Sequence, residues 1–182
     1  MKNLFYKKKY LLFFCLLVCS LGLFSQNAIK IDNLGLKNLY QVDNGIFRSE
    51  QPNSQAFIKL ENYGIKEVLN LRFWHSDREK AEKTKLILHQ VPMKAEKIDD
   101  KEVTQALKII KNRKGNILIH CKHGSDRTGL IVAMYRIVFQ NWTKEKAIEE
   151  MTKEIFGFHN IYSNIIVYIQ NVNVENIKKQ IK

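Results

Sequence analysis

The sequence has few residues that interrupt regular structure and few that could cross-link it. Its 182 residues include two prolines, eight glycines and three cysteines. So little proline and glycine excludes a collagen-like or low-complexity chain, and so few cysteines exclude a disulfide-rich scaffold. No internal repeat is evident. Hydrophobic residues make up 45% of the chain, which is enough for one globular domain with a core of its own.

The first 25 residues differ in composition from the rest. Four lysines, the last of them Lys9, precede a largely apolar run over 10–24, and polar residues follow from Ser25. This is the layout of a secretory signal, and the run is shorter than the roughly 20 residues that a spanning helix needs. We therefore predict a signal peptide over 1–25, with a retained N-terminal membrane anchor as the less favoured alternative. We expect one domain over 26–182, exported to the periplasm or secreted, without stable membrane insertion if the signal is cleaved.

Removal of this segment would leave a basic domain with one thiol. Cys15 and Cys19 would leave with the signal, so Cys121 would be unable to form an internal disulfide. The segment holds four lysines and no acid, so the formal charge would fall from +12 to about +8. Such a charge favours anionic partners, although a basic, soluble surface accounts for it equally well. No nucleic-acid partner is expected.

Hydrophobic periodicity predicts strands that alternate with helices. We expect strands at 37–42, 45–49, 65–71, 86–92 and 117–119. We expect helices at 54–63, 98–113, 130–139, 143–154 and 161–177. The helix at 130–139 is almost entirely apolar, which predicts a central, buried position. The alternation predicts an α/β domain with a mostly parallel central sheet flanked by helices.

The stretch HCKHGSDRTG, residues 120–129, follows the predicted strand 117–119 and opens the predicted central helix. A loop in this position lies at the carboxyl end of the sheet, where open α/β sheets hold ligands. Its N–H groups and the positive end of the helix would form a cradle for an anion. Arg127 can offer two parallel hydrogen bonds to a tetrahedral oxyanion. These features together predict a phosphate site.

Cys121 would lie at the floor of this cradle, where the same donors stabilise a thiolate and make it a nucleophile aimed at phosphorus. A buried, inert thiol is the alternative. We expect the Thr128 hydroxyl to donate a hydrogen bond to the sulfur, and His120 to order the loop rather than act as a base. The predicted phosphate-binding loop consists of Lys122, His123, Gly124, Ser125, Asp126, Arg127 and Thr128.

HCKHGSDRTG resembles the signature loop of cysteine-dependent phosphatases of the protein tyrosine and dual-specificity type. Four flanking segments also resemble, in the same order, segments of small bacterial dual-specificity phosphatases, some of which are periplasmic. These segments are GIFRSEQP (45–52), GIKEVLNLR (64–72), QVPMKAEKIDD (90–100) and GLIVAMYRIV (129–138). The resemblance covers about 39–158. It implies a tyrosine-phosphatase-like fold, a phosphocysteine intermediate, and neither a metal nor a cofactor.

The proton donor for the leaving group is open. The resemblance places an aspartate after a strand that ends in Val-Pro, but here the first acid after that dipeptide is Glu96. A glutamate is longer by one methylene and can still act as a general acid. Asp126 and Asp99 are the alternatives, although Asp99 also fits the cap of the helix that follows.

These observations predict a phosphomonoester hydrolase, in first place a protein tyrosine or dual-specificity phosphatase. Its partner would be a phosphorylated protein or a small anionic phosphomonoester. Lys122 and His123 could enhance the positive field of the loop, which would suit an inositol phosphate or phosphoinositide phosphatase, the second hypothesis. The third is a pseudophosphatase that binds phosphate without turnover, and the lack of an aspartate at the usual donor position is its only support.

Overall fold

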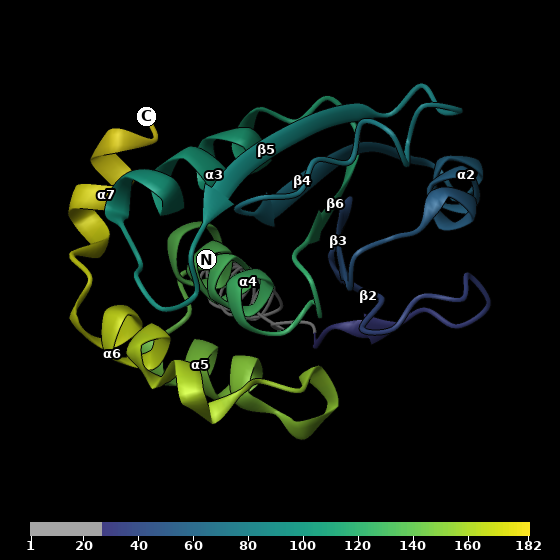
Figure 1. Ribbon diagram of the computed structural model, residues 1–182. Coiled ribbons are helices and arrows are strands. Elements are labelled where there is room, and N and C mark those ends of the chain that lie inside the picture. The colour runs from purple at the N-terminus through teal and green to yellow at the C-terminus, as the bar shows by residue number, and fades with distance from the viewer. Residues whose placement is uncertain (1–26) are drawn as a thin grey trace, which may run out of the picture.

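The computed structural model describes residues 27–182 (Figure 1). The predicted signal segment, with Cys15 and Cys19, lies outside these residues, so its role in export stays a prediction. No helix within the described part of the chain is long and apolar enough to cross a membrane.

A six-stranded sheet forms the centre of the fold, in the order β1-β2-β3-β6-β4-β5. The strands are β1 (Ile29–Lys30), β2 (Tyr40–Asp43), β3 (Ile46–Ser49), β4 (Ile65–Arg72), β5 (Ile87–Met93) and β6 (Asn116–His120). The four strands β3, β6, β4 and β5 run parallel, whereas β1 and β2 add an antiparallel edge. The predicted α/β class is confirmed, and β1 is a strand that the periodicity did not indicate.

Helices cover both faces of this sheet (Figure 1). On one face, α2 (Ser54–Tyr63) packs Phe57 and Leu60 against Leu118 of β6. The larger core lies on the other face, under α3 (Asp100–Asn112), α4 (Asp126–Gln140), α5 (Lys144–Thr152), α6 (Ser163–Asn171) and α7 (Val174–Gln180). Because both faces are covered, the central strand β6 is apolar and buried along Ile117–Ile119.

Local signals set the bounds of α2 as the sequence indicated. The side chain of Asn53 accepts a hydrogen bond from the N–H of Ala56 at 2.8 Å, which caps the first turn. Gly64 ends the helix in the left-handed region, with φ of 105°. Strand β4 therefore begins directly after the helix, at Ile65.

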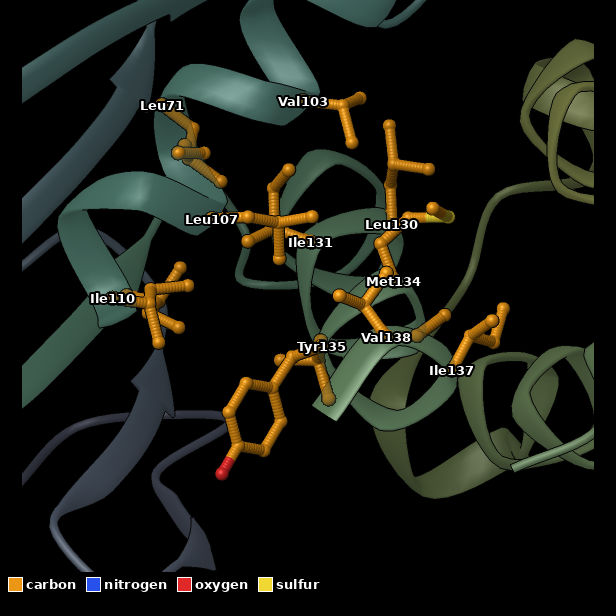
Figure 2. Packing of buried hydrophobic residues seen from close by; sticks show 14 of the residues in the cluster. Leu71, Val103, Leu107, Ile110, Leu130, Ile131, Met134, Tyr135, Ile137 and Val138 are labelled. Carbon is orange, nitrogen blue, oxygen red and sulfur yellow. The ribbon is translucent and has the colours of Figure 1, made fainter. Parts of the chain in front are cut away.

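Helix α4 is buried on nearly every side, as its composition predicted. Twelve of its 15 residues are buried. Figure 2 shows Leu130, Ile131 and Met134 of α4 in one cluster with Val103 and Leu107 of α3. The loop that precedes α4 is thus joined to an element that packing holds in place.

The end of the chain differs from the prediction of one long helix over 161–177. The structure has two helices, because Val172 leaves the helical region, with ψ of 135°, and the side chain of Asn173 caps α7 through the N–H of Asn176. Ile161, expected on the apolar face, lies in the short 3-10 helix η2 (Asn160–Tyr162) and is 83% exposed. The preceding helix α5 also stops at Thr152, and a second 3-10 helix, η1 (Glu154–Phe156), follows it.

Helices α4 and α5 are joined by a buried ion pair, which we expect to be essential for stability. Two nitrogens of Arg136 donate to the two carboxylate oxygens of Glu150, at 3.0 and 2.8 Å. Glu150→Ala leaves a buried guanidinium without its partner, so the free energy of unfolding should fall by about 3–5 kcal/mol in urea denaturation. The exposed neighbour Glu149 supplies the control, Glu149→Ala, which should unfold like the wild type. Equal effects of the two substitutions would contradict this assignment.

Candidate active site

The stretch 121–125 connects β6 to α4 at the carboxyl end of the parallel sheet. Its position is set by the neighbours of β6, since Ser49 of β3 and Asn70 of β4 both lie beside His120. The chain segments that leave β3 and β4 therefore flank the loop on its two sides. This is the edge at which the sequence placed the phosphate site.

The carbonyl groups of this loop are turned outward by four hydrogen bonds. The Cys121 carbonyl accepts from His120 Nδ1 at 3.2 Å, and that of Lys122 accepts from the Gln51 N–H at 3.1 Å. The His123 carbonyl accepts from Asn38 Nδ2 at 2.9 Å, and the Gly124 carbonyl accepts from Arg48 Nη2 at 2.7 Å.

With the carbonyls occupied, the N–H groups are left for an anion. Within the described part of the chain, the N–H groups of residues 122–125 donate to no backbone acceptor. The N-terminus of the 15-residue helix α4 adds its partial positive charge at the same place. Gly124 permits the turn, because its φ is 74° and a Cβ there would lie 2.5 Å from the Ser49 carbonyl. The loop is thus a preformed anion cradle.

Cys121 and Arg127 lie at opposite ends of this loop. Cys121 is reduced and 1% exposed. Arg127, in the first turn of α4, donates from Nη1 to the Met93 carbonyl at the end of β5, at 3.2 Å. Its Nε is buried without a partner among the described residues. A buried, unpaired donor beside an anion cradle is the arrangement expected of a group that binds the missing anion.

The expectation for Thr128 is wrong in this structure. Its hydroxyl is buried and makes no hydrogen bond with any described residue, so it does not donate to the Cys121 sulfur. Ser125, at the N-cap position of α4, likewise makes no side-chain capping bond. It instead accepts from Asn38 Nδ2 at 3.4 Å, which places it in the support of the loop.

His120 belongs to a buried network behind the loop. Its Nε2 lies 2.8 Å from Asp77 Oδ2, and the other oxygen of Asp77 accepts from Gln51 Nε2 at 2.8 Å. Arg72 extends this network by donating a hydrogen bond from Nη1 to Gln51 Oε1 at 3.0 Å. Both ring nitrogens of His120 are therefore engaged in ordering the loop, the role that the sequence favoured over that of a base.

The charge of Asp77 is stabilised within this network. Burial alone would raise the pKa of Asp77, but the hydrogen bond and charge of His120, with Gln51 and Lys80, hold that pKa below its ordinary value. Asp77 is thus an anion at neutral pH and is buried. Its partner at the end of β6 is His120, whose Nε2 lies 2.8 Å from Oδ2.

The three candidate acids lie in different environments. Glu96 is exposed at the tip of the turn 94–97 that follows β5, and its carboxylate makes no hydrogen bond or ion pair with any described residue. Asp99 caps α3 by accepting from the N–H of Lys101 at 2.7 Å. Asp126 is buried, and both its oxygens lie 3.0 Å from Nδ1 of His159. The structure thus engages Asp99 and Asp126 in other contacts.

Positive side chains surround the cradle and act on one another. Burial and the neighbouring charge of Arg127 lower the pKa of Arg72. The charge of Arg72, then burial and the charges of Lys80 and Lys122, lower the pKa of His75. Burial and Lys122, with His159, also lower the pKa of His123. Burial is the larger cause for Arg72 and His123, but neighbouring positive charges contribute to all three shifts, which indicates a positive field at the carboxyl edge of the sheet.

Comparison with known proteins agrees with this geometry. The model of the tyrosine phosphatase family matches residues 34–182. The chain belongs to this family. The resemblance found in the sequence is therefore confirmed, and so is the fold that it implied.

Curated relatives include bacterial and plant proteins. The chain is 34% identical over 143 residues to the dual specificity protein phosphatase TpbA of Pseudomonas aeruginosa (strain UCBPP-PA14). This match covers 78% of this chain and 65% of that protein. It is also 30% identical over 122 residues to the inositol diphosphatase DSP4 of Arabidopsis thaliana, covering 62% of this chain and 61% of that protein. The match thus spans less than two thirds of either relative.

Solved structures share the fold over more of their length. The crystal structure of P. aeruginosa TpbA in complex with pTyr has a TM-score of 0.76 at 30% identity, and the match covers 87% of this chain and 98% of that one. The core catalytic domain of the PP-IP phosphatase SIW14 from S. cerevisiae has a TM-score of 0.69 at 27% identity. That match covers 79% of this chain and 90% of the other.

Sequence reasoning missed Arg48, which supports the loop by a hydrogen bond to one of its carbonyl groups. Its guanidinium is buried, donates to the Gly124 carbonyl, and lies 4.1 Å from the centre of the Phe156 ring. Burial lowers the pKa of Arg48 to about 10, so the group is still charged at neutral pH. The segment GIFRSEQP was singled out for its resemblance alone, and nothing local in it distinguishes a buried arginine from a surface one. Asn38 and Asp77 gave no signal either.

Asp77→Ala should lower stability in a pH-dependent way. It removes the acceptor that His120 and Gln51 share, so the free energy of unfolding at pH 7 should fall by about 1–3 kcal/mol. The folded-state pKa of Asp77 lies below its ordinary value of 3.8. The stabilisation from its charge is therefore complete at pH values above 3.8. It is lost as the pH falls through the folded-state pKa. The difference between wild type and variant should therefore shrink below pH 3.8.

Urea denaturation across this pH range measures the effect. The exposed neighbour Glu79 offers the control, Glu79→Ala, which should behave like the wild type at every pH. A stability difference for Asp77→Ala that stays constant as the pH falls would show that the charge of Asp77 contributes nothing.

Proposed function

We propose that this protein is a phosphomonoester hydrolase of the protein tyrosine or dual-specificity type that works through a phosphocysteine intermediate. The observation that carries the proposal is the preformed anion cradle with a reduced cysteine and an arginine at its two ends. A module that only binds phosphate needs no nucleophile at this position. The dual specificity relative and the TpbA structure with pTyr make phosphotyrosine the first substrate to test.

The first step forms the covalent intermediate. The phosphate oxygens bind to the N–H groups of residues 122–125 and to the Arg127 guanidinium, which places phosphorus next to Cys121. The thiolate attacks phosphorus and a sulfur–phosphorus bond forms, while the bond from phosphorus to the leaving oxygen breaks. A carboxylic acid donates its proton to that oxygen. The donors of the cradle stabilise the charge on the transferring phosphoryl group.

The second step releases phosphate. The carboxylate left by the first step accepts a proton from water, and the water oxygen attacks phosphorus. The sulfur–phosphorus bond breaks, inorganic phosphate leaves, and Cys121 returns to the thiolate form. The positive cradle again stabilises the departing thiolate.

We assign the acid to Glu96. Asp99 is used as a helix cap and Asp126 is paired with His159, whereas the Glu96 carboxylate has no such contact in the described residues. The turn that carries Glu96 begins at Lys94, next to Met93, whose carbonyl holds Arg127. Glu96 borders a groove of about 450 Å³ against α6, and the assignment requires its carboxyl group to reach the leaving oxygen of a substrate bound in the cradle.

A second candidate function is hydrolysis of inositol phosphates. The specific observation in its favour is that Arg72, then burial and the charges of Lys80 and Lys122, lower the pKa of His75 at this edge of the sheet. A positive field of this kind suits a substrate with several phosphate groups. The inositol diphosphatase relative from A. thaliana and the yeast PP-IP phosphatase agree with this candidate.

Phosphate release by the reduced protein tests the reaction and separates the two substrate classes. The panel contains an aryl phosphate, phosphotyrosine and phosphoserine peptides, and inositol phosphates including pyrophosphorylated forms. We expect the highest kcat/KM with phosphotyrosine and no turnover by Cys121→Ser, because the nucleophile is missing while the cradle remains. Higher kcat/KM with inositol phosphates would favour the second candidate. A folded, reduced wild type that is inert on the whole panel would contradict both, and retained activity of Cys121→Ser would contradict the mechanism.

Glu96→Gln tests the assignment of the acid. Loss of a general acid should lower kcat by about 10²- to 10⁴-fold for peptide substrates with poor leaving groups. The loss should be much smaller for an activated aryl phosphate, whose leaving oxygen needs no proton. Asp99→Asn is the matched control, because asparagine caps a helix as well as aspartate does. A normal Glu96→Gln together with an impaired Asp99→Asn would move the assignment to Asp99.

A further inference from the structure

Three side chains with metal-binding atoms meet beside the phosphate loop. His123 lies in the loop, Asp126 begins α4, and His159 comes from the segment between η1 and η2. One ligand atom of each lies within 4.8 Å of the ligand atoms of the other two. The reaction described above uses none of these side chains as a reacting group, so their meeting calls for another explanation.

Asp126 and His159 are already spaced almost as two ligands of one ion. Nδ1 of His159 lies 3.0 Å from each oxygen of Asp126, and the His159 N–H donates to Oδ1 at 2.9 Å. With zinc–ligand bonds of about 2.0–2.2 Å, neighbouring ligands of a tetrahedral site lie roughly 3.3 Å apart. An ion can therefore replace the proton between these groups if they separate by about 0.3 Å.

The third side chain is close and accessible. The ring centres of His123 and His159 lie 5.3 Å apart, and both side chains are exposed, whereas Asp126 is buried. Asn38 holds the two backbone segments together, since its Nδ2 donates to the carbonyls of both His123 and Phe156. His123 thus places an imidazole nitrogen within 4.8 Å of a pair of ligand atoms that is already in place.

We propose that His123, Asp126 and His159 form a zinc site at the rim of the phosphate loop. Two imidazoles and one carboxylate are a ligand set that zinc accepts, and the fourth position of the tetrahedron faces water. Magnesium and calcium prefer sites made of oxygen ligands. The site goes beyond the proposed reaction, which needs no metal, and zinc binding here does not depend on turnover.

Zinc titration of a cysteine-free full-length chain tests the proposal. Cys15→Ser, Cys19→Ser and Cys121→Ser remove every thiol that could bind zinc instead. Competition of the untagged protein with a chromophoric zinc chelator gives the affinity and the number of ions bound. We expect one ion per chain, and His159→Ala or His123→Ala should weaken its binding by at least about tenfold, since each removes one of three ligands.

His75→Ala supplies the matched control. His75 is another exposed histidine at the same edge of the sheet but lies outside the cluster. Its replacement should leave zinc affinity unchanged, and circular dichroism without metal shows whether each variant is folded. His123 is exposed, so His123→Ala keeps the test valid if His159→Ala should fail to fold. Equal zinc affinity in the folded cluster variants and the parent, or an equal loss in His75→Ala, would overturn the proposal.

Discussion

The site depends on one constraint, that the carbonyl groups of residues 121–124 face away from the pocket. Carbonyl oxygens that pointed inward would repel a phosphate, whereas N–H groups attract it. Four donors hold the outward orientation, one each from His120, Gln51, Asn38 and Arg48. Each such bond contributes only about 0.5–1.5 kcal/mol to stability, but together they fix the sign of the field inside the loop. Anion binding requires that field, and so does the proposed reaction.

Helix α4 holds the other end of the loop through packing rather than hydrogen bonds. Its N-terminus supplies part of the positive field, and the contacts of its apolar side chains keep that end aimed at the cradle (Figure 2). The fit is close, because a Cβ on Gly129 would lie 2.9 Å from Met151 of α5. The electrostatics of the loop are therefore maintained by the hydrophobic core.

The sequence predicted the loop, the parallel sheet and the supporting role of His120, but not the distant groups that support the loop. Cys121 and Arg127 belong to one contiguous motif whose residue types identify its chemistry, and the buried strand and helix beside it have clear periodicity. The supporting residues Asn38, Arg48 and Asp77 come from separate segments and become neighbours only through the pairing of β3 and β4 with β6. The break between α6 and α7 was missed because apolar side chains recur at helical spacing over 161–177. The two non-helical residues Val172 and Asn173 break the helix without disturbing that spacing.

The tethers also determine when the site can form during folding. Asn38 and Arg48 lie 85 and 76 residues away from the carbonyls that they hold. Contacts of such high sequence separation form only after the entropy of closing long loops has been overcome, so they belong to the slow part of assembly. Residues 120–129 in isolation, although they contain the nucleophile and the arginine, lack the donors that turn their carbonyls outward. In the proposed reaction, the role of Cys121 is thus a property of the completed tertiary structure, because a nascent or partly unfolded chain lacks the cradle that surrounds it.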